Sequence, residues 1–277
     1  MTLSISDAFT DGAKAFTKPA IVGTVAAFAL FELLSAMLMQ TLARGLTEFG
    51  LDLAGTSYDR LYEILTTNTE IPREWLEGLL FGIEPTLGEV FPLSIGDLPP
   101  LIAIVVATLF FVALAILTEL IYLLAVRATA GERYRANPLS GLHFVVFHGI
   151  LAGLITMQII FTSFVPFVLP AIVFAILFSF VPQVVALDEV NAFRAIADSV
   201  GHVWDNALRV GVLAIGFFVA QYVVMWAVTL FAELVTPSPW ITHLLVNPIH
   251  AVLIVLWLTI ATEAYLQIRP VEQPPEA

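Results

Sequence analysis

The sequence predicts an all-α protein that crosses a membrane as a bundle of about six helices, with one further amphipathic helix at the membrane surface. Hydrophobic residues make up 59% of the 277 residues and charged residues 12%, whereas soluble domains are about 45–50% apolar and about 25% charged. The mean hydropathy is +0.94. A single soluble core cannot bury this much apolar surface, so we expect residues 1–277 to form one integral membrane domain.

Six apolar runs are long enough to span the hydrocarbon layer, for which a helix needs roughly 20 residues. They cover about 20–43, 101–126, 142–164, 167–187, 210–235 and 245–268. Pro182 lies near the end of the fourth run and should kink that helix, because proline removes a backbone hydrogen bond. Gly149 and Gly153 have the spacing that lets a neighbouring helix approach closely.

The basic residues predict the orientation of the bundle, because cytoplasmic segments are rich in Lys and Arg. With a cytoplasmic N-terminus, the inner segments hold Lys14, Lys18, Arg127, Arg133, Arg135, Arg194, Arg209 and Arg269. The outer segments hold Arg44, Arg60 and Arg73. We therefore expect a multi-pass protein of the cell membrane, with residues 1–19 and the tail 269–277 both in the cytoplasm.

The formal net charge of −12 is concentrated in the extracellular segment that joins the first two spans. Residues 44–100 hold Glu48, Asp52, Asp59, Glu63, Glu70, Glu74, Glu77, Glu84, Glu89 and Asp97, against three Arg. High salt screens the repulsion between such charges, so an acidic surface is typical of proteins in salt-rich surroundings. The composition predicts a halophilic protein with an acidic outer loop.

Residues 188–209 predict an amphipathic helix at the cytoplasmic interface. Asp188 is placed to cap its start, and Trp204 suits the headgroup level. Apolar residues recur with helical spacing at Val190, Phe193, Ile196, Val200, Val203 and Trp204. Polar residues fill the other face, which is the pattern of a helix that lies in the membrane surface.

A resemblance to a known family is carried by this part of the chain. The segments are Val184–Val190, Ala195–Ser199 and Trp204–Arg209: a helix end with an acidic turn, an Ala-x-x-x-Ser helix, and a small-polar turn into the next span. Over residues 184–211 the chain resembles uncharacterised haloarchaeal six-helix membrane proteins, and more remotely the membrane domain that accompanies glycerophosphodiester phosphodiesterases. The resemblance implies an archaeal membrane protein and transfers no functional residue.

Ionisable residues inside a membrane are costly and usually face protein or water. Glu119 and Glu263 are each followed by a Tyr and an Arg near the inner ends of two helices, and His148 and Gln183 fall at similar depth. These four residues predict a polar cluster in the inner leaflet, which could be a proton relay or an ion site. Glu32 lies near the middle of the first span and completes the candidate intramembrane site. The alternative is that each Glu pairs with a nearby Arg and only fixes the rotation of its helix.

Other chemistry is not expected. The chain has no Cys, which excludes disulfides and thiolate ligands, and it lacks HExxH, GxSxG and Gly-rich phosphate-loop motifs. His243 and His250 share one helical face, but Pro248 interrupts the run and no acid lies nearby in the sequence, so a metal site there is not predicted. We expect no enzymatic activity, no cofactor, no metal and no nucleic-acid partner.

Three classes of function are considered, of which an intramembrane enzyme ranks last because the sequence lacks a catalytic motif. The first is a structural or accessory membrane component that contacts the lipid bilayer, other membrane proteins or a second copy of itself. The alternative is a small transporter or permease-like subunit that uses the intramembrane Glu residues. Transporters often contain inverted repeats. The likeness found here is between Thr118-Glu119 in the second span and Thr262-Glu263 in the sixth, which is the wrong pairing for such a repeat. The first class is therefore favoured.

Overall fold

The computed structural model describes residues 2–33, 35, 60, 63, 100–133, 141–164, 168–235 and 239–269. These residues form helices joined by short turns, and no strand occurs among them. In chain order the elements are α1 (Ile5–Phe16), the helix Pro19–Leu33, α5 (Pro100–Ala130), the short 3-10 helix η3 (Gly131–Arg133), α6 (Leu142–Phe164), α7 (Val168–Leu177), α8 (Val181–Asp188), α9 (Ala192–Trp204), α10 (Ala207–Val235) and α11 (Pro239–Ile268). The predicted all-α bundle is confirmed.

Among the described residues, five helical segments are long and apolar enough to cross a membrane. They are Thr108–Ala130, Leu142–Phe164, Val168–Asp188, Ala207–Ala232 and Leu244–Ile268. A sixth arises if α1 and the helix Pro19–Leu33, which meet at a bend of 79°, count as one broken span. Most of the acidic segment 44–100, the second part of the first predicted run and the tail after residue 269 lie outside the described residues.

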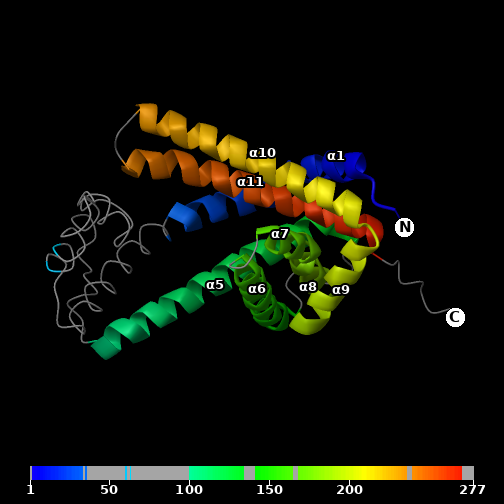
Figure 1. Cartoon of the computed structure of the whole chain (residues 1–277), viewed down its shortest axis with the longest axis horizontal. Helices are drawn as coiled ribbons and strands as arrows, with labels where there is room; N and C mark the ends of the chain where they lie inside the picture. The colour runs from blue at the N-terminus through cyan, green and yellow to red at the C-terminus, as the bar shows by residue number, and fades with distance from the viewer. Residues whose placement is uncertain are drawn as a thin grey trace.

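The N-terminal helix α1 is an element that the charge analysis did not anticipate. Ser4 caps it by accepting a hydrogen bond from the Asp7 N–H at 3.4 Å, and Figure 1 shows it beside α11. Its contact face consists of Ala8, Gly12 and Ala15. A Cβ at Gly12 would lie 2.7 Å from the Cα of Ile260, so only glycine permits this backbone approach.

Residues before α1 tie the start of the chain to the bundle. The Leu3 N–H donates to Asn206 Oδ1 at 3.3 Å, and the Leu3 carbonyl accepts from Arg209 Nη1 at 2.9 Å. The Ser4 N–H donates to Gln267 Oε1 at 2.8 Å. Leu3 and Ser4 thus join the start of α1 to the beginning of α10 and the end of α11.

The fourth span is divided into α7 and α8 by a turn at residues 178–180. Pro182 lies in the first turn of α8, where its missing N–H costs no helical bond. The predicted kink near Pro182 is confirmed. By contrast Pro248 lies inside α11, which continues through it, so the expected interruption there is wrong. Neighbouring helices can satisfy the carbonyl that such a proline frees.

The amphipathic helix α9 begins later than predicted. Asn191 caps it by accepting from the Arg194 N–H at 3.0 Å, whereas Asp188 ends α8 and Glu189 adopts a left-handed φ of 51°. The face that packs on the bundle consists of small residues: Ala192, Ala195, Ser199 and Val203. Phe193 and Trp204 remain exposed, as apolar side chains at a membrane surface would be.

The helices converge at one end of the molecule. In Figure 1, α5 diverges from α10 and α11 at the left of the view and approaches them at the right, near α1, α8 and α9. The most buried large side chains lie at the meeting point, among them Arg127, Phe180 and Tyr265. We call this the charged end, defined by α1, α8, α9, η3 and the C-terminal ends of α5 and α11.

Candidate functional site

A partly buried carboxylate–imidazole pair joins two helices of the bundle away from the charged end. Glu32 comes from the helix Pro19–Leu33 and His250 from α11, and the distance from Glu32 Oε1 to His250 Nδ1 is 2.7 Å. The Glu32 side chain is 17% exposed and that of His250 37%. Glu32 Oε2 is buried and has no hydrogen-bond partner among the described residues. No acid lies near His250 in the sequence, but the fold brings Glu32 to it from 218 positions away.

Helix α5 supplies the neighbours of this pair. The ring of Tyr122 packs edge-on against Phe28, with 5.8 Å between the centroids, and Phe28 lies one turn before Glu32. Tyr122 is within electrostatic reach of both Glu32 and Glu119, and Glu119 lies one turn before Tyr122 on the same face of α5. The two carboxylates therefore flank one phenol.

Glu119 is packed against α6 at Gly149. A Cβ on Gly149 would overlap the carboxylate of Glu119, so this glycine leaves room for a side chain of α5. Gly153 has no atom within 4 Å of the position of a Cβ. The GxxxG spacing therefore does not form a two-glycine helix contact within the described bundle.

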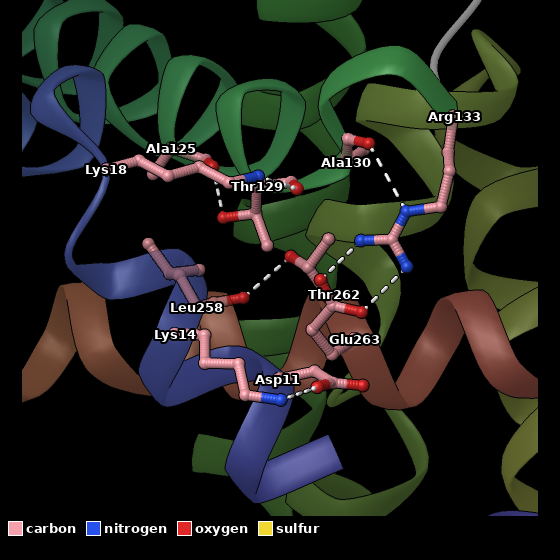
Figure 2. Close-up of polar contacts among 10 residues, drawn as sticks. All are labelled: Asp11, Lys14, Lys18, Ala125, Thr129, Ala130, Arg133, Leu258, Thr262 and Glu263. Atoms are coloured by element: carbon pink, nitrogen blue, oxygen red, sulfur yellow. Dashed lines mark hydrogen bonds and ion pairs between the residues drawn. The ribbon is translucent and has the colours of Figure 1, made fainter. Parts of the chain in front are cut away.

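Glu263, unlike the first two Glu residues, forms an ion pair at the charged end. Figure 2 shows the guanidinium of Arg133, from η3, facing the Glu263 carboxylate of α11. Arg133 Nη1 donates to Oε2 at 2.8 Å, Nη2 donates to Oε1, and Nε donates to the Ala130 carbonyl at 3.3 Å. The hydrogen bonds that Arg133 donates to Glu263 raise the pKa of Arg133 above its ordinary value. The geometry matches the alternative in which a Glu pairs with a nearby Arg.

Two more Arg–carboxylate pairs close the charged end. The buried Arg127 of α5 donates through Nη2 to Glu189 Oε1 at 3.0 Å and through Nε to the Ala186 carbonyl at 3.0 Å. Arg269, after α11, pairs with Asp188 of α8, which also accepts a hydrogen bond from the Tyr265 hydroxyl. Together these contacts join α5, α8 and α11.

His148 and Gln183 complete the list of predicted site residues. His148 Nδ1 accepts from the Ala192 N–H at 3.4 Å, so its ring faces the start of α9. Gln183 is fully buried in α8, and neither of its amide atoms has a hydrogen-bond partner among the described residues. Nothing in these contacts links either side chain to Glu119.

The structure thus brings together part of the predicted set. Glu32 and Glu119 share Tyr122 as a neighbour, while Glu263, His148 and Gln183 contact other elements. Sequence reasoning missed His250 as the partner of Glu32. The two residues are 218 positions apart, and a single sequence holds no signal for a contact across that separation.

No group of three or more His, Cys, Asp or Glu side chains in the described part of the chain is arranged to hold a metal ion.

Comparison with known proteins places the chain in a family of unknown function. No similar protein was found among the curated proteins, and no solved structure matches the chain. The family model described as "Domain of unknown function (DUF7847)" matches residues 98–268. This match extends over more than half of the 277 residues, so the chain belongs to that family.

Proposed function

We propose that this multi-pass membrane protein is a structural or accessory component of the membrane, without enzymatic activity. The observation that carries the proposal is the mutual pairing of the charged side chains where the helices converge. Arg127, Arg133 and Arg269 each meet a carboxylate from another element. Groups that neutralise one another hold helices in fixed positions and are poorly placed to accept and release a cargo.

The exposed surface of the spans also supports this role. In α10 the exposed large apolar residues recur at helical spacing: Val212, Ile215, Val219, Tyr222 and Trp226. Such a stripe suits contact with lipid tails or with another apolar helix. Lipid, a neighbouring membrane protein or a second copy of the chain are the partners that this chemistry fits.

Flux and assembly measurements together test the proposal. Purified protein in liposomes should show no flux of protons, Na⁺ or K⁺ above protein-free liposomes. In native membranes solubilised with a mild detergent, the protein should migrate in a complex larger than the purified protein. Flux that is lost in Glu32→Gln, together with migration at the size of the purified protein, would overturn the accessory role.

A small transporter or permease-like subunit is the second candidate. The specific observation in its favour is the Glu32–His250 pair, with Glu119 nearby, away from the charged end. Ionisable pairs inside membrane helices are typical of ion pathways. The same liposome assay decides between the two functions, because this candidate requires flux that depends on these residues.

We also propose that the charged end faces the cytoplasm and that the acidic segment 44–100 faces a salt-rich exterior. Lys18 at the charged end donates to the Thr129 carbonyl at 3.1 Å, and Arg127, Arg133 and Arg209 lie there with it, which agrees with the positive-inside rule. The chain has no Cys, so single-cysteine variants are clean probes. An impermeant maleimide applied to intact cells should label Asp59→Cys and leave Thr2→Cys unlabelled, and the reverse pattern would contradict the orientation.

A further inference from the structure

The interior of the bundle holds ionisable groups that no Arg or Lys compensates in the described part of the chain. Glu32 Oε1 and His250 Nδ1 are 2.7 Å apart, and Glu32 is the charged group that acts on His250. From α5, Tyr122 and Glu119 face the same region. From α6 the contact is Gly149, which brings no charge. Two carboxylates, one imidazole and one phenol are thus the titratable groups around this position.

The charge balance of this set depends on protons. With both carboxylates ionised and the imidazole neutral, the set carries two negative charges in an apolar surrounding. One proton on the Glu32–His250 pair makes that pair neutral overall, on whichever of the two atoms it resides. An unpaired buried ion is far more costly than a paired or neutral one, so the pair has a strong physical reason to hold a proton.

Unpartnered polar atoms occur at the same place. Glu32 Oε2 is buried without a hydrogen-bond partner among the described residues, and so is Asn247 Nδ2. Asn247 lies three residues before His250, on the same face of α11. At the charged end, Glu263 uses both of its carboxylate oxygens with Arg133. The Glu32 carboxylate instead retains an acceptor that a proton can occupy.

We propose that Glu32 and His250, with Glu119 as a neighbouring carboxylate, form a proton-binding site inside the bundle. The ligand is a single exchangeable proton, taken from water and held between the Glu32 carboxylate and the His250 imidazole. Glu119 is the second carboxylate beside Tyr122. The site goes beyond the accessory role proposed above, and its test reads proton binding rather than flux, so the two can fail separately.

Nuclear magnetic resonance of ¹⁵N-histidine in the full chain, reconstituted in phosphatidylcholine–phosphatidylglycerol liposomes, tests the proposal. The chain has five His, and His250→Gln assigns the relevant signal by removing it. We expect the His250 signal to titrate, and its midpoint to move by at least about one pH unit in Glu32→Gln, since a contacting charge has an effect of that size. Glu119→Gln should move the midpoint by a smaller amount.

Glu263→Gln is the matched control, because it removes a Glu of the same kind from an ion pair at the charged end. It should leave the His250 midpoint unchanged. If Glu32→Gln does not fold, as judged by gel filtration, Glu32→Asp keeps the charge and withdraws it by one methylene, and should still move the midpoint. An unchanged midpoint in the folded Glu32 variant would overturn the site. A midpoint that shifts when choline replaces Na⁺ would also overturn it, since the ligand would then be a metal cation.

Discussion

The charged end and the bundle interior both contain acidic side chains in apolar surroundings, but their charges are balanced in different ways. At the charged end, Glu263 and Asp188 each meet an Arg. In the interior, Glu32 meets only an imidazole, and no ion pair joins Glu119 to a basic side chain within the described residues.

The difference follows from where an Arg can reside. A guanidinium stays charged at every physiological pH and is costly at the middle of a membrane. Arg133 lies just beyond the span, and its long side chain extends back to pair with Glu263. Half of the Arg133 side chain is exposed. In the described part of the chain, no Arg side chain pairs with Glu32 or Glu119. The permanent charges therefore hold the structure together at one end, and the interior retains groups whose charge can change.

Loss of Arg127 should have the largest effect on stability. Arg127→Ala removes the ion pair with Glu189 and a donor to the Ala186 carbonyl, and breaking one side of a buried pair costs roughly 3–5 kcal/mol. We expect the free energy of unfolding in detergent to fall by about 3 kcal/mol, because Glu189 is partly exposed. Arg194→Ala removes an exposed pair with Asp198 and should change it by less than about 0.5 kcal/mol. Equal losses in the two variants would show that the Arg127–Glu189 pair stabilises the protein no more than the exposed Arg194–Asp198 pair.

The contact between α1 and α11 should be the next most sensitive. Gly12→Ala forces the two backbones apart, because the new Cβ would lie 2.7 Å from the Ile260 Cα. Overpacking of this kind costs roughly 1–3 kcal/mol. Gly23 has no atom within 4 Å of a Cβ position, so Gly23→Ala is the matched control and should be neutral or stabilising. Chemical denaturation measures the free energy of unfolding of both variants. Equal values would argue against the close contact between Gly12 and Ile260.

The packing of Glu119 against Gly149 can be tested with a compensating double variant. Gly149→Ala places a methyl group where the Glu119 carboxylate lies and should lower the free energy of unfolding by about 1–2 kcal/mol, less than a backbone clash because a side chain can yield. The double variant Gly149→Ala with Glu119→Ala should recover part of that loss. Gly153→Ala, which meets no atom, is the control. Strict additivity of the two changes would contradict the contact.

The Arg133–Glu263 pair should contribute less than the Arg127 pair. Arg133 is half exposed, so solvent screens the pair, and Arg133→Gln should cost about 1 kcal/mol. The loss should shrink at high salt, because exposed charges are screened, whereas the loss for Arg127→Ala should not. Denaturation at low and high salt measures this difference. An identical salt response of the two variants would contradict the weaker contribution of the Arg133–Glu263 pair.

The smallest effect concerns the start of α9. Asn191→Ala removes the acceptor for the Arg194 N–H and should cost about 1 kcal/mol, as loss of a helix cap does. Asn191→Asp keeps a capping oxygen and should be nearly neutral. If Asp188 were the cap, as the sequence predicted, Asp188→Ala rather than Asn191→Ala would show the capping loss, which the same denaturation series measures.

The sequence by itself determined that this is an all-α membrane bundle and roughly where its spans lie. Apolar runs of 20 residues must form helices in lipid, because backbone polar groups have no other partner there. The runs at 142–164 and 167–187 therefore agree with the spans Leu142–Phe164 and Val168–Asp188 to within a residue or so. Pro182 marked the break in the second of these, since its effect on a helix is local.

Only the tertiary structure decided the partners of the buried charges. The chain order gives no reason for Glu32 to meet His250, for Glu263 to meet Arg133, or for α1 to lie along α11. Each contact depends on how helices far apart in sequence pack and rotate. Gly12 and Gly149 permit that packing because they lack a side chain, and their role is visible only beside the atoms that they leave room for.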